Sequence, residues 1–149
     1  MIIAANIHNA LAEADPGNAD EYKMNLGLLL RDLSALDNKI NRLLQPLQGR
    51  DFFVFHPSFG YFAHDYGLNQ VAVEIEGKSP TPRQIEYLIE QAQAAGVKII
   101  FVQPQFDPRS SSVIADSIQG TVISLNPLAY DLIENFEDMA VKIEKALTR

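Results

Sequence analysis

His56 is the residue whose type and position are best suited to chemistry. It directly follows the apolar run Phe52–Phe55, and Pro57 ends that run, so the imidazole is expected to project from the edge of a sheet. A neutral imidazole can act as a metal ligand or as a general base. The alternative is a structural histidine that caps the helical turn after it. The residues alone leave these interpretations open.

Other polar residues are weaker candidates. Glu74 and Glu76 follow a second apolar segment and could do acid–base work as a pair, but their position favours a solvated loop. His64 is expected to face solvent in a short helix, and His8 has no ionisable neighbour that could assist it. The sequence contains no His-x-x-x-His motif and no paired histidine–carboxylate motif. Because zinc prefers four tetrahedral ligands, we expect this chain alone to bind zinc weakly.

Composition and missing motifs exclude several function classes. The 149 residues carry a net charge of −7, and the 12 basic residues are scattered singly, which argues against a nucleic-acid partner. The absence of cysteine excludes disulfides and thiolate chemistry. No Walker-type loop, dinucleotide fingerprint or nucleophile elbow is present. We therefore expect a globular domain in which no catalytic set is visible; these observations do not favour an enzyme, but they leave one open.

The elements that must position His56 follow from the hydrophobic pattern. Between Asp20 and Leu47, leucine and isoleucine recur at three- and four-residue steps, which predicts a long amphipathic helix that ends near Pro46 and Gly49. Strand-like segments then alternate with helical ones. The strands are expected at 52–55, 70–74, 97–102 and 121–125, and the helices at 59–66, 82–95, 108–118 and 131–147.

This alternation predicts a parallel sheet with right-handed crossovers. The fold class is therefore α/β, with a long N-terminal helix followed by a four-stranded parallel sheet flanked by helices. Thr81 is the expected N-cap and Pro82 the first residue of the helix that should end at Gly96. We assign residues 1–50 to the N-terminal segment and long helix, and residues 51–149 to the α/β lobe. Asp15–Asn18 is predicted to form a turn before the long helix.

The N-terminal sequence does not indicate export, and no apolar run indicates membrane insertion. The first residues are apolar over only a short stretch and lack a basic region, so we expect no signal peptide. No run approaches the ~20 apolar residues that a membrane-spanning helix needs.

Around His56 the sequence resembles a known family. The string from His56 to Ala63, after its apolar run, is similar to the third metal-ligand segment of zinc and manganese ABC-transporter substrate-binding proteins, the zinc-uptake and treponemal-type group. Other segments resemble the same family in the same order, over nearly the whole chain. They are Asp15–Ala19 with Tyr22 and Asn25, Tyr66–Leu68, Ser79–Gln84, Gly96–Phe106 and Asn126–Ala129.

The resemblance implies a periplasmic or membrane-anchored uptake component of two α/β lobes that are joined by one rigid helix and hold a metal ion between them. By this resemblance the chain corresponds to the helix and the C-terminal lobe. Its expected partners are then the metal ion, an N-terminal lobe that brings further histidines, and an ABC permease. His56 occupies the first ligand position of the lobe, and Asp131 is the candidate for the second. A histidine favours zinc over manganese, because nitrogen is the softer donor.

The chain also departs from the family pattern. Gln103 stands where relatives often have glutamate, and Asn126 where aspartate is usual, which argues against further ligands at these positions. An apolar stripe on the long helix would be left for a homodimer if no first lobe covers it. Two alternatives remain: a small α/β hydrolase that uses His56 as base, and an interaction domain that has lost metal binding.

Overall fold

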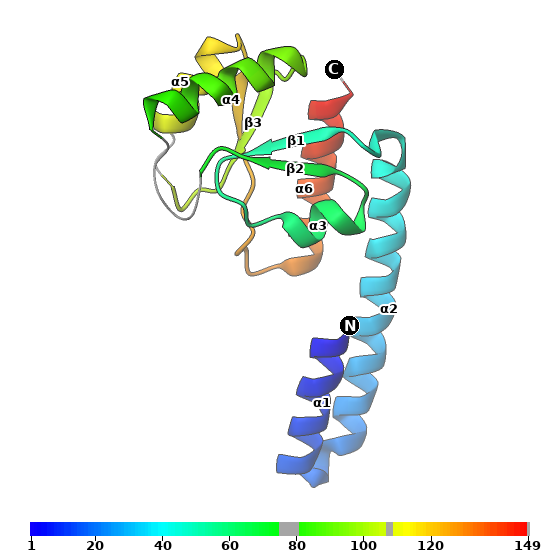
Figure 1. The fold of residues 1–149 in the computed structure, drawn as a ribbon. Helices are drawn as coiled ribbons and strands as arrows, with labels where there is room; N and C mark the ends of the chain where they lie inside the picture. The colour runs from blue at the N-terminus through cyan, green and yellow to red at the C-terminus, as the bar shows by residue number, and fades with distance from the viewer. Residues whose placement is uncertain (75–80, 107–108, 149) are drawn as a thin grey trace. The chain divides into compact units, whose positions relative to one another are not determined.

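The computed structural model of the 149-residue chain describes residues 1–74, 81–106 and 109–148, and for residues 109–111 the backbone alone. The chain divides into two compact units, Met1–Asn41 and Arg42–Arg149. Figure 1 shows the course of the chain through both units. No helix in these described ranges combines the length and apolarity that a membrane span requires.

The first unit is helical. It contains α1 (Ile2–Ala14), a 3-10 turn (Pro16–Asn18) and most of α2 (Ala19–Leu44). Helix α2 confirms the long helix predicted from the leucine pattern, and a second 3-10 turn (Gln45–Leu47) takes over where Pro46 ends it. We did not predict α1, which is rich in alanine, the strongest helix former.

The turn between α1 and α2 is held by the Asp15 side chain. Its carboxylate accepts hydrogen bonds from the Asn18 amide at 2.8 Å and from the Tyr22 hydroxyl at 2.9 Å. The bond from Asn18 and then that from Tyr22 lower the pKa of Asp15 below 3.8. The same interaction with Asp15 raises the pKa of Tyr22 above 10.0.

The second unit contains the predicted four-stranded parallel sheet. Its strands are β1 (Asp51–Val54), β2 (Asn69–Ala72), β3 (Ile99–Val102) and β4 (Thr121–Ser124), in the order β2-β1-β3-β4 with parallel pairing throughout. From β1 the chain moves outward to β2, and it then returns past β1 to form β3 and β4. The connections therefore change direction between β1 and β3, which is where open parallel sheets bind ligands.

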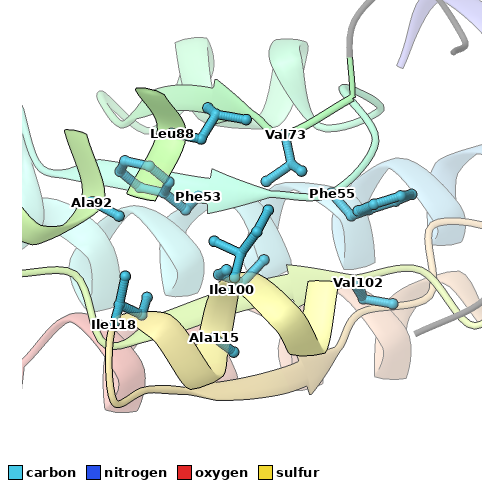
Figure 2. Close-up of a cluster of buried hydrophobic side chains, with 10 residues drawn as sticks. Phe53, Phe55, Val73, Leu88, Ala92, Ile100, Val102, Ala115 and Ile118 are labelled. Carbon is cyan, nitrogen blue, oxygen red and sulfur yellow. The ribbon is translucent and has the colours of Figure 1, made fainter. Parts of the chain in front are cut away.

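Apolar side chains cover both faces of the sheet. On one face Phe53 and Ile100 pack against Leu88 of α4 (Pro82–Ala94) and Ala115 of α5 (Arg109–Ser117), as Figure 2 shows. On the other face Phe52 contacts Phe101 of β3 and Phe59 in the loop before α3 (Gly60–Asp65). Phe62 of α3 in turn contacts Phe136 of α6 (Leu132–Leu147). Burial on both faces explains why β1 and β3 are continuous apolar runs.

The two ends of α4 confirm the predicted start and stop signals. Thr81 precedes the helix, Pro82 is its first residue, and the Gln84 side chain accepts hydrogen bonds from the Thr81 amide and hydroxyl at 2.8 Å each. At the other end Gly96 has a φ of 65°, a left-handed conformation that glycine adopts without strain.

Gly120 is required for a different reason, close backbone approach. It precedes β4, and a Cβ atom placed on it would lie 2.9 Å from the carbonyl carbon of Lys98, which leads into β3. The Lys98 carbonyl also accepts the hydrogen bond of the Thr121 amide at 2.8 Å. A side chain at position 120 would therefore push apart the backbones that begin the β3–β4 pairing.

The Asp15 bonds predict a measurable pH dependence. Asn18→Ala should raise the pKa of Asp15 toward 3.8, because it removes the stronger of the two bonds; NMR of the carboxyl carbon measures this. Since the folded pKa is the lower one, the stability from these bonds is present above about pH 3.8 and is lost as the pH falls through the folded value. Asn38→Ala, at an exposed helix position, is the control. An unchanged Asp15 pKa in Asn18→Ala would contradict the assignment.

A pair of glycine substitutions tests the packing at Gly120. Gly120→Ala should lower the free energy of unfolding by about 1–3 kcal/mol, because the added methyl group overpacks a backbone contact. Gly27→Ala, inside α2 with nothing within 4 Å of the new atom, should raise it by about 1 kcal/mol through helix propensity. Urea unfolding followed by circular dichroism measures both. If both substitutions changed the free energy of unfolding in the same direction and by the same amount, the close backbone contact at Gly120 would not restrict the side chain there.

Candidate functional site

Three residues lie in one row at the carboxyl edge of the sheet. Strand β1 pairs with β2 at a constant offset of 18 residues, and Val54 pairs with Phe101 of β3 at an offset of 47. The ladder continues beyond the strands, because the Phe55 amide donates to the Phe101 carbonyl at 2.7 Å and the Glu74 amide to the Phe55 carbonyl at 2.8 Å. The same offsets set His56 beside Glu74 and Gln103.

The imidazole of His56 is held on two sides. Its Nδ1 atom lies 2.6 Å from Oε2 of Glu74, and its ring stacks on Phe106 with centroids 4.9 Å apart and an interplanar angle of 27°. The His56 side chain is 35% exposed, whereas that of Glu74 is 7% exposed. The ring is therefore fixed at its Nδ1 edge and on one face, while part of it remains accessible to solvent.

Gln103 fixes the backbone of the His56 loop. Its amide nitrogen donates to the His56 carbonyl and to the Ser58 hydroxyl, at 2.7 Å each, and its amide oxygen accepts from the His56 N–H at 3.4 Å. Gln103 is only 1% exposed, so these bonds satisfy a buried amide that would otherwise be costly. In this chain the residue at position 103 therefore supports the loop through an uncharged side chain.

The expectation for Glu74 was wrong. We predicted that Glu74 and Glu76 lie in a solvated loop, but Glu74 is buried and bonded to His56. The physical reason is the parallel register, which continues past the end of β2 and carries Glu74 to the position beside His56. Glu76 lies outside the described residues.

Asp131 acts locally as a helix cap. It is exposed, and its Oδ1 atom accepts a hydrogen bond at 3.0 Å from the Glu134 amide in the first turn of α6. The Asn126 side-chain oxygen accepts hydrogen bonds from the Leu128 N–H in its own loop and from the Gln105 side-chain amide in the segment after β3. Among the described residues, no group of three or more histidine, cysteine, aspartate or glutamate side chains is arranged to hold a metal ion.

The other histidines are surface residues. The His64 side chain is 87% exposed, as expected, and its Nδ1 lies 3.3 Å from the carboxylate of the adjacent Asp65. His8 has a side-chain contact at 3.0 Å with the adjacent Asn9. Neither contact joins separate elements of the fold, which distinguishes both from the contact between His56 and Glu74.

A hollow of about 730 Å³ lies at the opposite, amino edge of the sheet. Arg50, Lys98 and Gly120 are among the residues that line it, at or next to the starts of three strands. No histidine lines it, and parallel sheets bind their ligands at the carboxyl ends of the strands. The His56 row is therefore the better candidate site.

Comparison with known proteins finds close structural similarity to zinc-uptake proteins. The structure superposes on the crystal structure of ZnuA with a TM-score of 0.93 and 40% sequence identity, over 96% of this chain and 54% of that one. A ZnuA deletion mutant with zinc bound gives a TM-score of 0.90, 40% identity and coverage of 96% and 55%.

Curated proteins with similar sequences are also zinc-uptake components. The high-affinity zinc uptake system protein ZnuA of Brucella abortus is 29% identical over 134 residues, which cover 88% of this chain and 40% of that protein. The chain thus spans about half the length of the proteins that it matches, or less. The profile of the family described as "ZnuA: Zinc-uptake complex component A periplasmic" matches residues 1–148. That family is a metal-binding component of transport and not an enzyme, so the hydrolase alternative is set aside. The chain belongs to this family of periplasmic zinc-uptake components.

Proposed function

We propose that this chain forms one side of a zinc site in an ABC uptake system, with His56 as a ligand. An N-terminal lobe would supply the remaining ligands, and a membrane permease would receive the metal. The protein would act in the periplasm or anchored outside the cytoplasmic membrane. In this proposal residues 1–50 serve as the connecting segment and helix, and residues 51–149 as the metal-binding lobe.

The position of one imidazole carries the proposal. His56 follows β1 at the point where the sheet connections change direction, and its ring is partly exposed there. Imidazole nitrogen suits zinc better than manganese, which prefers oxygen donors. Manganese is therefore the less favoured cargo.

Asp131 is proposed as a second ligand of the same lobe. Capping α6 occupies its Oδ1 atom, and a carboxylate has a second oxygen that could bind a metal ion.

A zinc titration tests His56 as a ligand. When Zn²⁺ is added to the 149-residue chain, NMR should show its largest changes at the His56 ring, and His56→Ala should abolish them. His64→Ala is the matched control, because that ring is exposed and its ion-pair partner Asp65 is the adjacent residue. Equal responses of His56 and His64 would contradict the proposed ligand.

The same titration distinguishes the two roles of Asp131. Asp131→Asn keeps a good N-cap but removes the charged ligand, so it should weaken zinc binding with little loss of helix stability. Unchanged binding in Asp131→Asn would remove this residue from the site. Absence of any zinc response in the wild-type chain would favour an interaction domain without a metal.

Exposed apolar residues of the first unit support a proposed homodimer through the long helix, α2. Those in α2 include Met24 at 61% and Leu28 at 45%, and those in α1 include Ile3 at 75% and Ile7 at 56%. In a protein with two lobes, an N-terminal lobe would compete for such a surface.

Sedimentation velocity over a range of concentrations tests this association. The chain should form a concentration-dependent dimer, and Met24→Glu in α2 should weaken it because a charge would enter an apolar contact. Tyr61→Glu, at a residue of α3 that is 91% exposed, is the control and should leave the dimer unchanged. A monomer at high concentration would exclude this use of α2.

A further inference from the structure

We propose that Glu74 is a positioning residue that selects the tautomer of His56 and so directs Nε2 toward the metal. This inference rests on the proposed function and adds to it a residue that is not a ligand. Its basis is the Nδ1–Oε2 distance of 2.6 Å together with the burial of the glutamate.

The chemistry of the pair determines which nitrogen carries the hydrogen. A carboxylate has no hydrogen to donate, so the short contact requires the hydrogen on Nδ1 of His56. In the neutral ring, Nε2 then carries the lone pair, and it is the nitrogen that can bind a metal ion. A ligating histidine that donates its other N–H to a carboxylate is the usual outer-shell arrangement of zinc sites.

The surroundings keep Glu74 and His56 in place. The Glu74 backbone extends the β1–β2 ladder, so its side chain starts from a fixed position in the sheet. Phe106 stacks on the imidazole at 4.9 Å, and Gln103 holds the backbone of His56 through its amide. Ring rotation would break the contact with Glu74 and the stacking at once. The ring is therefore oriented before any metal arrives.

His64 provides an internal comparison. It also has a carboxylate near Nδ1, that of Asp65, but the distance is 3.3 Å and both side chains are mostly exposed. Water competes for both groups there, so this contact should fix the tautomer far less. The effect expected at His56 therefore depends on burial and register and not on the mere presence of a carboxylate.

The first measurement is the tautomer of each histidine in the metal-free, 149-residue chain, from the ring nitrogen shifts in long-range ¹H–¹⁵N NMR at a pH where the rings are neutral. His56 should carry its hydrogen on Nδ1. In Glu74→Gln this preference should be lost, because an amide can accept a hydrogen bond from Nδ1–H or donate one to bare Nδ1. Asp65→Asn is the matched control and should leave His56 unchanged.

The second measurement is titration of the same chains with Zn²⁺ alone, followed at the His56 ring. Glu74→Gln should weaken zinc binding about 10- to 100-fold, the usual effect of losing an outer-shell partner, while Asp65→Asn should have no effect. Thermal unfolding of each variant checks that the fold is kept. Should Glu74→Gln fail to fold, the wild-type tautomer still decides the proposal.

The outcomes separate this inference from the proposed function. A wild-type His56 with its hydrogen on Nε2, or with mixed tautomers, overturns the role of Glu74 even if His56→Ala abolishes zinc binding. Unchanged zinc affinity in a folded Glu74→Gln variant overturns it as well. If zinc does not act at His56 in the wild-type chain, the proposed function fails, and with it the role of Glu74 toward a metal. The metal-free tautomer would then show only whether Glu74 orients the ring.

Discussion

The register of the parallel sheet is the constraint on which the candidate site depends. Offsets of 18 and 47 residues align β1 with its two neighbours, and they also align the residues just beyond the strands. Glu74, His56 and Gln103 therefore reach the carboxyl edge in one row, although they are far apart in the chain. A shift of one residue in either pairing would turn every side chain of the shifted strand to the other face and would separate its residue from the row.

The buried polar side chains of the same row must also find hydrogen-bond partners. Glu74 and Gln103 are the buried polar residues of the described chain, and both direct their side chains to the His56 segment. No buried side-chain nitrogen or oxygen among the described residues lacks a partner. Since an unpaired buried polar group costs about 1–3 kcal/mol, these bonds keep the edge folded and at the same time limit how the imidazole can move.

Local patterns predicted the elements well, but the contacts between them much less. Two kinds of local feature were located correctly. They are the continuous apolar runs of β1 and β3, and the helix start at Thr81 with the helix stop at Gly96. The partner of His56 was missed because Glu74 is 18 residues away and its neighbours look like a polar loop. Assuming parallel pairing of adjacent strands and counting two residues past each would have identified it. Helix α1 was missed because its apolar residues form no clear stripe, while its alanines favour a helix.

The proposed half-site would have a thermodynamic consequence for metal transport. Zinc prefers four ligands, whereas this lobe offers one oriented imidazole, with Asp131 as a proposed addition. Most of the binding energy would then come from joining this lobe to groups elsewhere, and moving those groups away would release the ion. Preorganising His56 lowers the entropy cost of assembly without adding a ligand that would retain the metal after the lobes separate. In this proposal Glu74 favours capture, and the shortage of ligands favours release.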